Sequence, residues 1–158
     1  MWYNDINNKT NSQGGTSMAR RSRREKYPDT KYYTYYNANP RGRITGDCVF
    51  RAFSFALGIP YNECVMEMAE TMCETGYSLN DKKGIERFLA KKGLVKQPQL
   101  KHPDGTKYTV KDFVMTHKKG TYILSMAHHI TVVKEGKNYD IWDCARLGGC
   151  VGNYWEVK

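Results

Sequence analysis

The chain has 158 residues, of which 40% are hydrophobic and 13% aromatic, and its formal net charge is +9. That length and composition predict one folded domain and exclude a disordered chain. No apolar stretch approaches the roughly 18 residues needed to cross a bilayer, and the polar N-terminal sequence lacks the apolar region of a secretory signal. We therefore expect a cytoplasmic protein that makes no membrane contact.

The N-terminal third carries most of the positive charge. Residues 1–45 contain nine Lys/Arg and three Asp/Glu, whereas residues 46–158 contain 16 and 13. We expect residues 1–26 to form a flexible basic tail, residues 27–45 to form a tyrosine-rich arm and loop, and residues 46–158 to form a single domain. Met18, within the tail, is an alternative start.

Basic residues interleaved with tyrosines suit contact with phosphates and stacking on bases, although a basic tail also serves solubility alone. A nucleic acid, a virion component or a host protein would be the partner of such an arm. The candidate contact residues are Arg20, Arg21, Arg23, Arg24, Tyr32 and Tyr33.

The first half of the domain shows helical patterns. A buried helix is predicted to begin at Cys48, with Asp47 as its N-cap, and to end at Gly58. Two further helices are predicted over residues 61–76 and 80–93, the latter capped by Asn80.

The second half is dominated by strand patterns. Residues 94–100 form a candidate edge segment, and Thr109 with Asp112 forms a capping pattern that predicts a short helix. A long strand is expected over 121–134, followed by a tight turn and an antiparallel return strand, and the C-terminal sequence "VGNYWEVK" adds a last strand. Helices followed by an antiparallel sheet define an α+β fold.

The cysteines favour a reducing compartment, because five is an odd number and their spacing is irregular. Neither a CxxC nor an HxxxH pattern occurs, so the sequence predicts no metal site and no other cofactor. Cys64 and Cys73 are interpreted as core thiols. Cys48 differs, since the start of a helix stabilises a thiolate and its unpaired amides can also bind an oxyanion.

A nucleophilic cysteine needs a base and a group that orients the base. His102 and His117 are interpreted as surface residues, which leaves His128 and His129 within the long predicted strand. A three-residue turn after that strand makes Asp143 the same-face diagonal neighbour of His129, whereas a two-residue turn sets His128 opposite Asp143. We favour the first register and predict His129 with Asp143.

The segment "GDCVFRA" around Cys48 resembles the nucleophile motif of ovarian-tumour-type (OTU) deubiquitinases, although their Asp-Gly-x before the cysteine is here Gly46-Asp47. The order Cys, His, Asp is similar to that of papain-like cysteine peptidases. The resemblance covers residues 40–58 and 120–144. It implies a papain-like fold, with helices packed on an antiparallel sheet.

The same resemblance bears on the oxyanion hole, where papain-like enzymes use a glutamine before the cysteine. No glutamine lies between Asn39 and Cys48, so Asn39 or the backbone at Asp47 is the candidate. The chain also resembles small bacteriophage proteins that share "NPRGR.TGDC", "HxTVV..GK.YD.WDC" and "VGNYW" segments. This second resemblance brings no activity with it.

The sequence thus predicts a phage-encoded cysteine hydrolase, a peptidase or isopeptidase, with Cys48, His129 and Asp143 as its triad. Its partner would be a protein or peptide substrate in the infected host cell. The same triad would also serve acyl transfer. The alternative is an inactive papain-like scaffold in which the basic arm binds nucleic acid, a virion component or a host factor.

Overall fold

The computed structural model describes residues 21–158, so the Met18 and Arg20 predictions and most of the expected tail lie outside the described residues. The helices are α1 (Arg23–Lys26), α2 (Cys48–Leu57), α3 (Tyr61–Thr75), α4 (Lys82–Lys91) and α5 (Val110–Thr116). The strands are β1 (Tyr33–Tyr35), β2 (Lys96–Gln97), β3 (Thr121–Met126), β4 (His129–Lys134), β5 (Lys137–Asp140) and β6 (Tyr154–Val157). The α+β class predicted from the sequence is confirmed.

The six strands of the described chain form one sheet in the order β1-β5-β4-β3-β6-β2. Every neighbouring pair is antiparallel except β1 and β5, which are parallel, so the sheet is mixed where a purely antiparallel one was expected. The predicted edge segment contributes β2, at one end of the sheet, and the predicted C-terminal strand is β6, beside β3.

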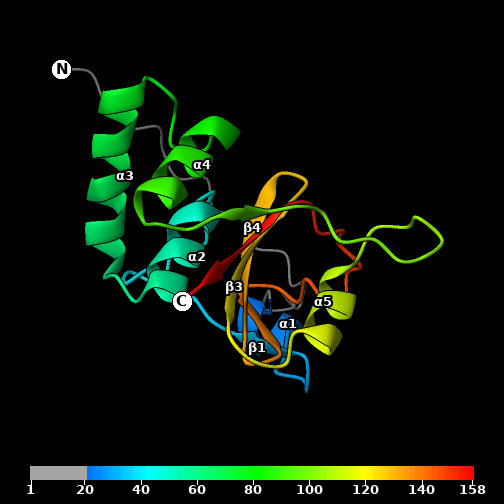
Figure 1. Ribbon diagram of the computed structural model, residues 1–158. Coiled ribbons are helices and arrows are strands. Elements are labelled where there is room, and N and C mark those ends of the chain that lie inside the picture. Colours follow the sequence, from blue (N-terminus) through cyan, green and yellow to red (C-terminus); the bar gives the residue numbers. More distant parts are fainter. Residues whose placement is uncertain (1–20) are drawn as a thin grey trace, which may run out of the picture.

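Helices cover both faces of this sheet (Figure 1). Helices α2, α3 and α4 pack on one face, where Ile123, Ile130 and Trp155 join their apolar side chains. Helix α5 packs on the other face, against a cluster that contains Leu124 and Val133. Neighbouring residues along β3 and β4 therefore serve opposite cores, as the alternation of side chains along a strand requires.

The helix ends follow from local sequence. Gly58 takes a left-handed conformation (φ 67°) at the C-cap of α2, as a helix-ending glycine does. Thr109 and Asp112 form the predicted capping box of α5. Helix α4 departs from expectation, because its N-cap is Asp81 and not Asn80; the Asp81 carboxylate accepts the N–H of Lys83.

Two turns between the strands differ from what the sequence predicted. The single strand predicted over 121–134 is a hairpin, because Ala127 and His128 form a turn in which His128 has a φ of 56°. The next turn consists of Glu135 and Gly136, whose positive φ values of 49° and 69° match the twist of a two-residue hairpin. The three-residue turn that we favoured from the sequence is therefore wrong.

The tyrosine-rich arm is part of the sheet. Its residues 33–35 form β1 alongside β5, and the fully buried Tyr33 donates its hydroxyl to the backbone oxygen of Asp140 at 3.0 Å. Residues 23–26, expected to be flexible, form α1 with a capping box between Ser22 and Glu25. The boundary expected at residue 45 thus falls within one continuous structural unit.

None of the helices found between residues 21 and 158 has the length and apolar character required to span a bilayer.

Candidate active site

Cys48 is the first residue of α2, and it is half-buried. The first N–H groups of a helix lack intrahelical partners, so they lie free beside this thiol. Burial raises the pKa of Cys48, but the imidazole of His129 and the N–H of Ile130 lower it by more, so that the net pKa falls below its ordinary value. The site thus favours a thiolate at Cys48.

His129 begins β4 and is bonded to a buried carboxylate. Its Nε2 lies 2.6 Å from Oδ2 of Asp140, whose side chain is 5% exposed. Burial alone lowers the pKa of His129, but the hydrogen bond with Asp140, aided by Cys144 and Cys48, raises it to about 11. His129 is therefore protonated near neutral pH, and its charge favours ionisation of Cys48.

The remaining ring nitrogen of His129, Nδ1, is available to Cys48. No hydrogen bond of ordinary length and angle joins the sulfur to this ring in the described structure. The two groups are nevertheless close enough that His129 lowers the pKa of Cys48 and Cys48 raises the pKa of His129. Such contacts are often long before a substrate binds and shorten in the reactive complex. The ring is further fixed by Trp142, whose centroid lies 4.8 Å from it.

The predicted pairing of His129 with Asp143 is corrected to His129 with Asp140. With the two-residue turn, Val132 pairs with Tyr139, and continuing this register by one pair brings Asp140 diagonally beside His129 on the same face. Asp143 is also buried, but its Oδ1 accepts the N–H of Arg146 at 2.9 Å and holds the following turn. The sequence signal for the two-residue turn was the pair Glu135 and Gly136. That turn sets the register that makes Asp140 the partner of His129.

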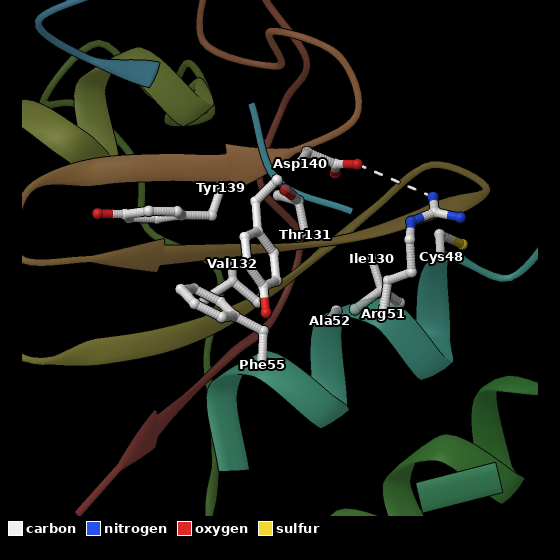
Figure 2. A pocket seen from close by; sticks show the side chains of 10 residues that line it. Cys48, Arg51, Ala52, Phe55, Ile130, Thr131, Val132, Tyr139 and Asp140 are labelled. Carbon is white, nitrogen blue, oxygen red and sulfur yellow. Dashed lines mark ion pairs between the residues drawn. The ribbon is translucent and has the colours of Figure 1, made fainter. Parts of the chain in front are cut away.

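Arg51 is a second site residue that sequence reasoning missed. It lies one turn into α2, is 6% exposed and pairs with Asp47. On its other side it pairs with Oδ1 of Asp140 at 3.9 Å (Figure 2). A charged residue amid the apolar run that follows Cys48 was the available signal, since buried charges are almost always paired.

The side chains of Asp47 and Asn39, the two residues predicted for the oxyanion hole, bond to each other. Asp47 is the N-cap residue of α2 by position, but its side chain makes no capping bond; its Oδ2 accepts the Tyr61 hydroxyl at 2.7 Å and the Asn39 amide at 2.9 Å. The Asn39 amide is thus directed at Asp47 and Tyr61. Asn39 also lines a separate hollow, and Cys48 is not part of the lining of that hollow. The free N–H groups at the start of α2 remain the candidate oxyanion donors.

Cys48 and His129 line two hollows, and Gly46 and His128 also line both of them. One hollow, of about 580 Å³, has an apolar wall that includes Val49, Ile85, Met126, Ile130 and Trp155. The other, of about 520 Å³, is lined in part by Arg23, Arg51 and Trp142. A chain can therefore lie across the thiol with groups on both sides of it.

Apart from His128, the other thiols and imidazoles of the described chain line neither of these two hollows. Cys64 is buried, as predicted, and burial raises its pKa to about 12. Cys73 is exposed, so its interpretation as a core thiol is wrong. His102 lies 3.3 Å from Asp112, and His117 stacks on the buried ring of Phe113, which leaves it half-buried and not on the surface as expected.

Compared with known protein families, with curated proteins and with solved structures, the chain matches none.

The geometry predicts that Asp140, and not Asp143, controls the ionisation of His129. In Asp140→Asn, loss of the bonded negative charge should lower the pKa of His129 towards its ordinary value of about 6.5. In the matched variant Asp143→Asn, the pKa should stay raised. Titration of the His129 ring resonances by NMR, with circular dichroism as the folding control, measures both. A fall in Asp143→Asn with no change in Asp140→Asn would contradict the assignment.

Proposed function

We propose that this chain is a papain-like cysteine hydrolase that cleaves a peptide or isopeptide bond. The observation that carries the proposal is the buried 2.6 Å contact between His129 and Asp140, beside a thiol whose pKa is lowered at the start of a buried helix. These are the nucleophile, the base and the orienting group that acyl transfer to cysteine requires.

In the proposed reaction, the Cys48 thiolate attacks the carbonyl carbon, and the carbonyl electrons move to oxygen. Free N–H groups at the start of α2 stabilise this oxyanion. His129, protonated at Nδ1, gives its proton to the leaving amine as the C–N bond breaks, which leaves a thioester on Cys48. Neutral His129 then takes a proton from water, the resulting hydroxide displaces the thiolate, and the acid product leaves.

Asp140 keeps the imidazole oriented throughout, because its hydrogen bond to Nε2 leaves Nδ1 directed to the reacting atoms. The two hollows supply room for acyl and leaving groups on opposite sides of Cys48, which supports cleavage within a chain. The apolar wall with Ile85 and Trp155 suits an apolar side chain next to the cleaved bond.

The proposal predicts that Cys48 alone becomes acylated. With an N-acetyl-leucine p-nitrophenyl ester as the probe, intact-mass spectrometry should find one acyl group per chain, and nitrophenol release should report its rate. Cys48→Ala should abolish both, and His129→Ala should slow acylation by about 10²–10⁴-fold, because the imidazole that stabilises the thiolate and transfers its proton is lost. The matched variant Cys64→Ala should react as the unaltered chain does. Equal acylation of Cys48→Ala and Cys64→Ala would sink the assignment.

A second candidate function, binding of nucleic acid through the arm, is favoured by one cluster. Around the half-buried ring of Tyr32 lie the ammonium groups of Lys31, Lys111 and Lys118, at 4.6, 5.9 and 5.9 Å from its centroid. Within residues 21–158, none of these three lysines takes part in an ion pair. Gathered, unpaired cations attract phosphates, and the ring adds a stacking surface.

The other arm residues predicted to contact a nucleic acid differ in their exposure to solvent. Arg21, Arg23 and Arg24 are exposed, although Arg24 lies over the ring of Tyr35. Tyr33 is fully buried and cannot stack on a base, so its prediction as a contact is wrong. The candidate surface is therefore centred on Tyr32 and its lysines.

This second function predicts binding that weakens steeply with salt. Fluorescence anisotropy with a labelled single-stranded oligonucleotide should show weaker binding by the double variant Lys111→Glu/Lys118→Glu. The slope of log affinity against log salt should shrink by about 0.7 for each lost phosphate contact. Lys82→Glu/Lys83→Glu changes the net charge equally on α4, across the sheet, and should bind almost as well. Equal weakening in both pairs would show a general charge effect and reject the surface.

A further inference from the structure

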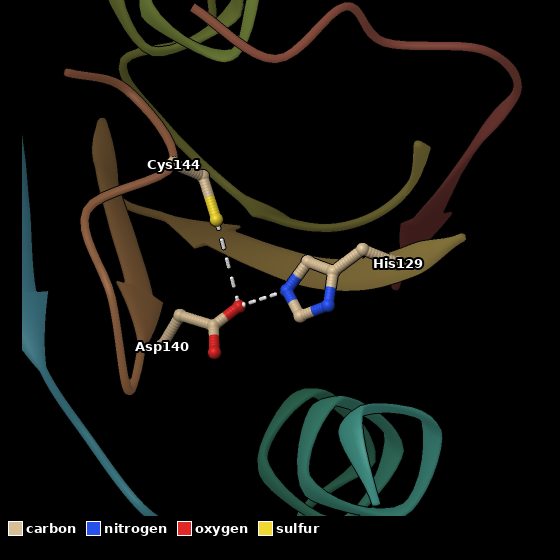
Figure 3. Close-up of side chains that lie close together, drawn as sticks. All are labelled: His129, Asp140 and Cys144. Carbon is tan, nitrogen blue, oxygen red and sulfur yellow. Dashed lines mark hydrogen bonds and ion pairs between the residues drawn. The ribbon is translucent and has the colours of Figure 1, made fainter. Parts of the chain in front are cut away.

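Three side chains with different donor atoms converge beside β4 and β5. The imidazole of His129, the carboxylate of Asp140 and the thiol of Cys144 place their donor atoms within 4.8 Å of one another (Figure 3). The thiol donates to Asp140 Oδ2 at 3.6 Å, and His129 Nε2 lies 2.6 Å from that same oxygen. Asp140 and Cys144 are buried, and the side chain of His129, the most exposed of the three, is only 11% exposed.

The proposed hydrolase explains His129 and Asp140 here, but it does not require a thiol at position 144. Cys144 is fully buried, and its backbone N–H is fixed by Asn138 Oδ1 at 3.2 Å. Its sulfur makes weak contacts of 3.7 Å with Thr131 Oγ1 and the Trp142 carbonyl. A rigid third donor is therefore held against a histidine–carboxylate pair.

Sulfur, imidazole nitrogen and carboxylate oxygen are the donors that zinc takes in proteins. Ordinary tetrahedral zinc bonds separate a sulfur from an oxygen ligand by about 3.5 Å and a nitrogen from an oxygen ligand by about 3.3 Å. The sulfur–oxygen distance of 3.6 Å already fits. The nitrogen–oxygen pair, at 2.6 Å, would open by about 0.7 Å as a metal replaces the shared proton.

We propose that His129 Nε2, Asp140 Oδ2 and Cys144 Sγ form a zinc site, and that zinc bound there inhibits the hydrolase reversibly. Binding releases the Cys144 thiol proton and the Nε2 proton to solvent, and the metal takes both vacated positions. The imidazole then carries its proton on Nδ1, the nitrogen available to Cys48. It can no longer accept a proton, and Asp140 no longer orients it.

The inhibition rests on the proposed function, whereas the site itself does not. Its location is specific: the metal uses the Nε2 side of His129 together with Cys144. A zinc ion held between Cys48 and His129, on the Nδ1 side, would inhibit equally well but would not need Cys144. The two arrangements are therefore separated by which cysteine the metal requires.

Metal binding is measured on the full chain by titrating Zn²⁺ against a chromophoric chelator. We expect one zinc per chain and at least about tenfold weaker binding in Cys144→Ser, because even second-shell changes commonly cost about 10–100-fold. Cys48→Ser and the buried-thiol control Cys64→Ser should bind as the unaltered chain does. Co²⁺ in place of Zn²⁺ should give a thiolate charge-transfer band that disappears in Cys144→Ser alone.

The controls keep the two claims apart. Zinc-free Cys144→Ser should keep the circular dichroism of the unaltered chain, which shows that the fold survives the change. If no stoichiometric zinc binds, or if Cys48→Ser loses zinc while Cys144→Ser keeps it, the zinc site is overturned. If zinc binds as expected but Cys48 never becomes acylated, the hydrolase fails and the metal site stands.

Discussion

The candidate site depends on the ion pairs that the buried guanidinium of Arg51 makes. This guanidinium lies between the carboxylates of Asp47 and Asp140, and all three side chains are almost fully buried. Two carboxylates against one guanidinium leave one negative charge in a region of low dielectric. A proton on His129 compensates the negative charge of Asp140, and the hydrogen bond and charge of Asp140 hold the pKa of His129 high. The charged histidine in turn favours a thiolate at Cys48.

The same ion pairs tie the helical half of the molecule to the sheet. Arg51 belongs to α2 and Asp140 to the end of β5, so the pair fixes where the first turn of α2 lies relative to the sheet. Asp47 extends the network to Asn39 and Tyr61, at the entry to α2 and the start of α3. Removing one partner of such a set leaves a buried charge without compensation, at a cost of about 3–5 kcal/mol. The fold and the ionisation of the site are therefore linked.

Much of the fold could be predicted from local sequence patterns. The C-terminal end of α2, the capping box of α5 and the α+β class follow from capping residues and hydrophobic period, which act within a few neighbours. The partner of His129 depended instead on the register of a hairpin, where one residue of turn length changes every pairing. The burial of Tyr33 and the pairing of Arg51 depend on strands and helices far apart in the chain, and no local pattern encodes them. The convergence of Cys144 on His129 has the same origin.

The proposed function depends on the ionisation of Cys48 in the resting protein. Its most direct measurement is the pH dependence of thiolate absorbance in the ultraviolet, taken as the difference between the unaltered chain and Cys48→Ser. Because the net pKa of this thiol is lowered, the thiolate should form below the ordinary pKa of a cysteine side chain. A Cys48 thiol that titrates at or above that value would contradict the account.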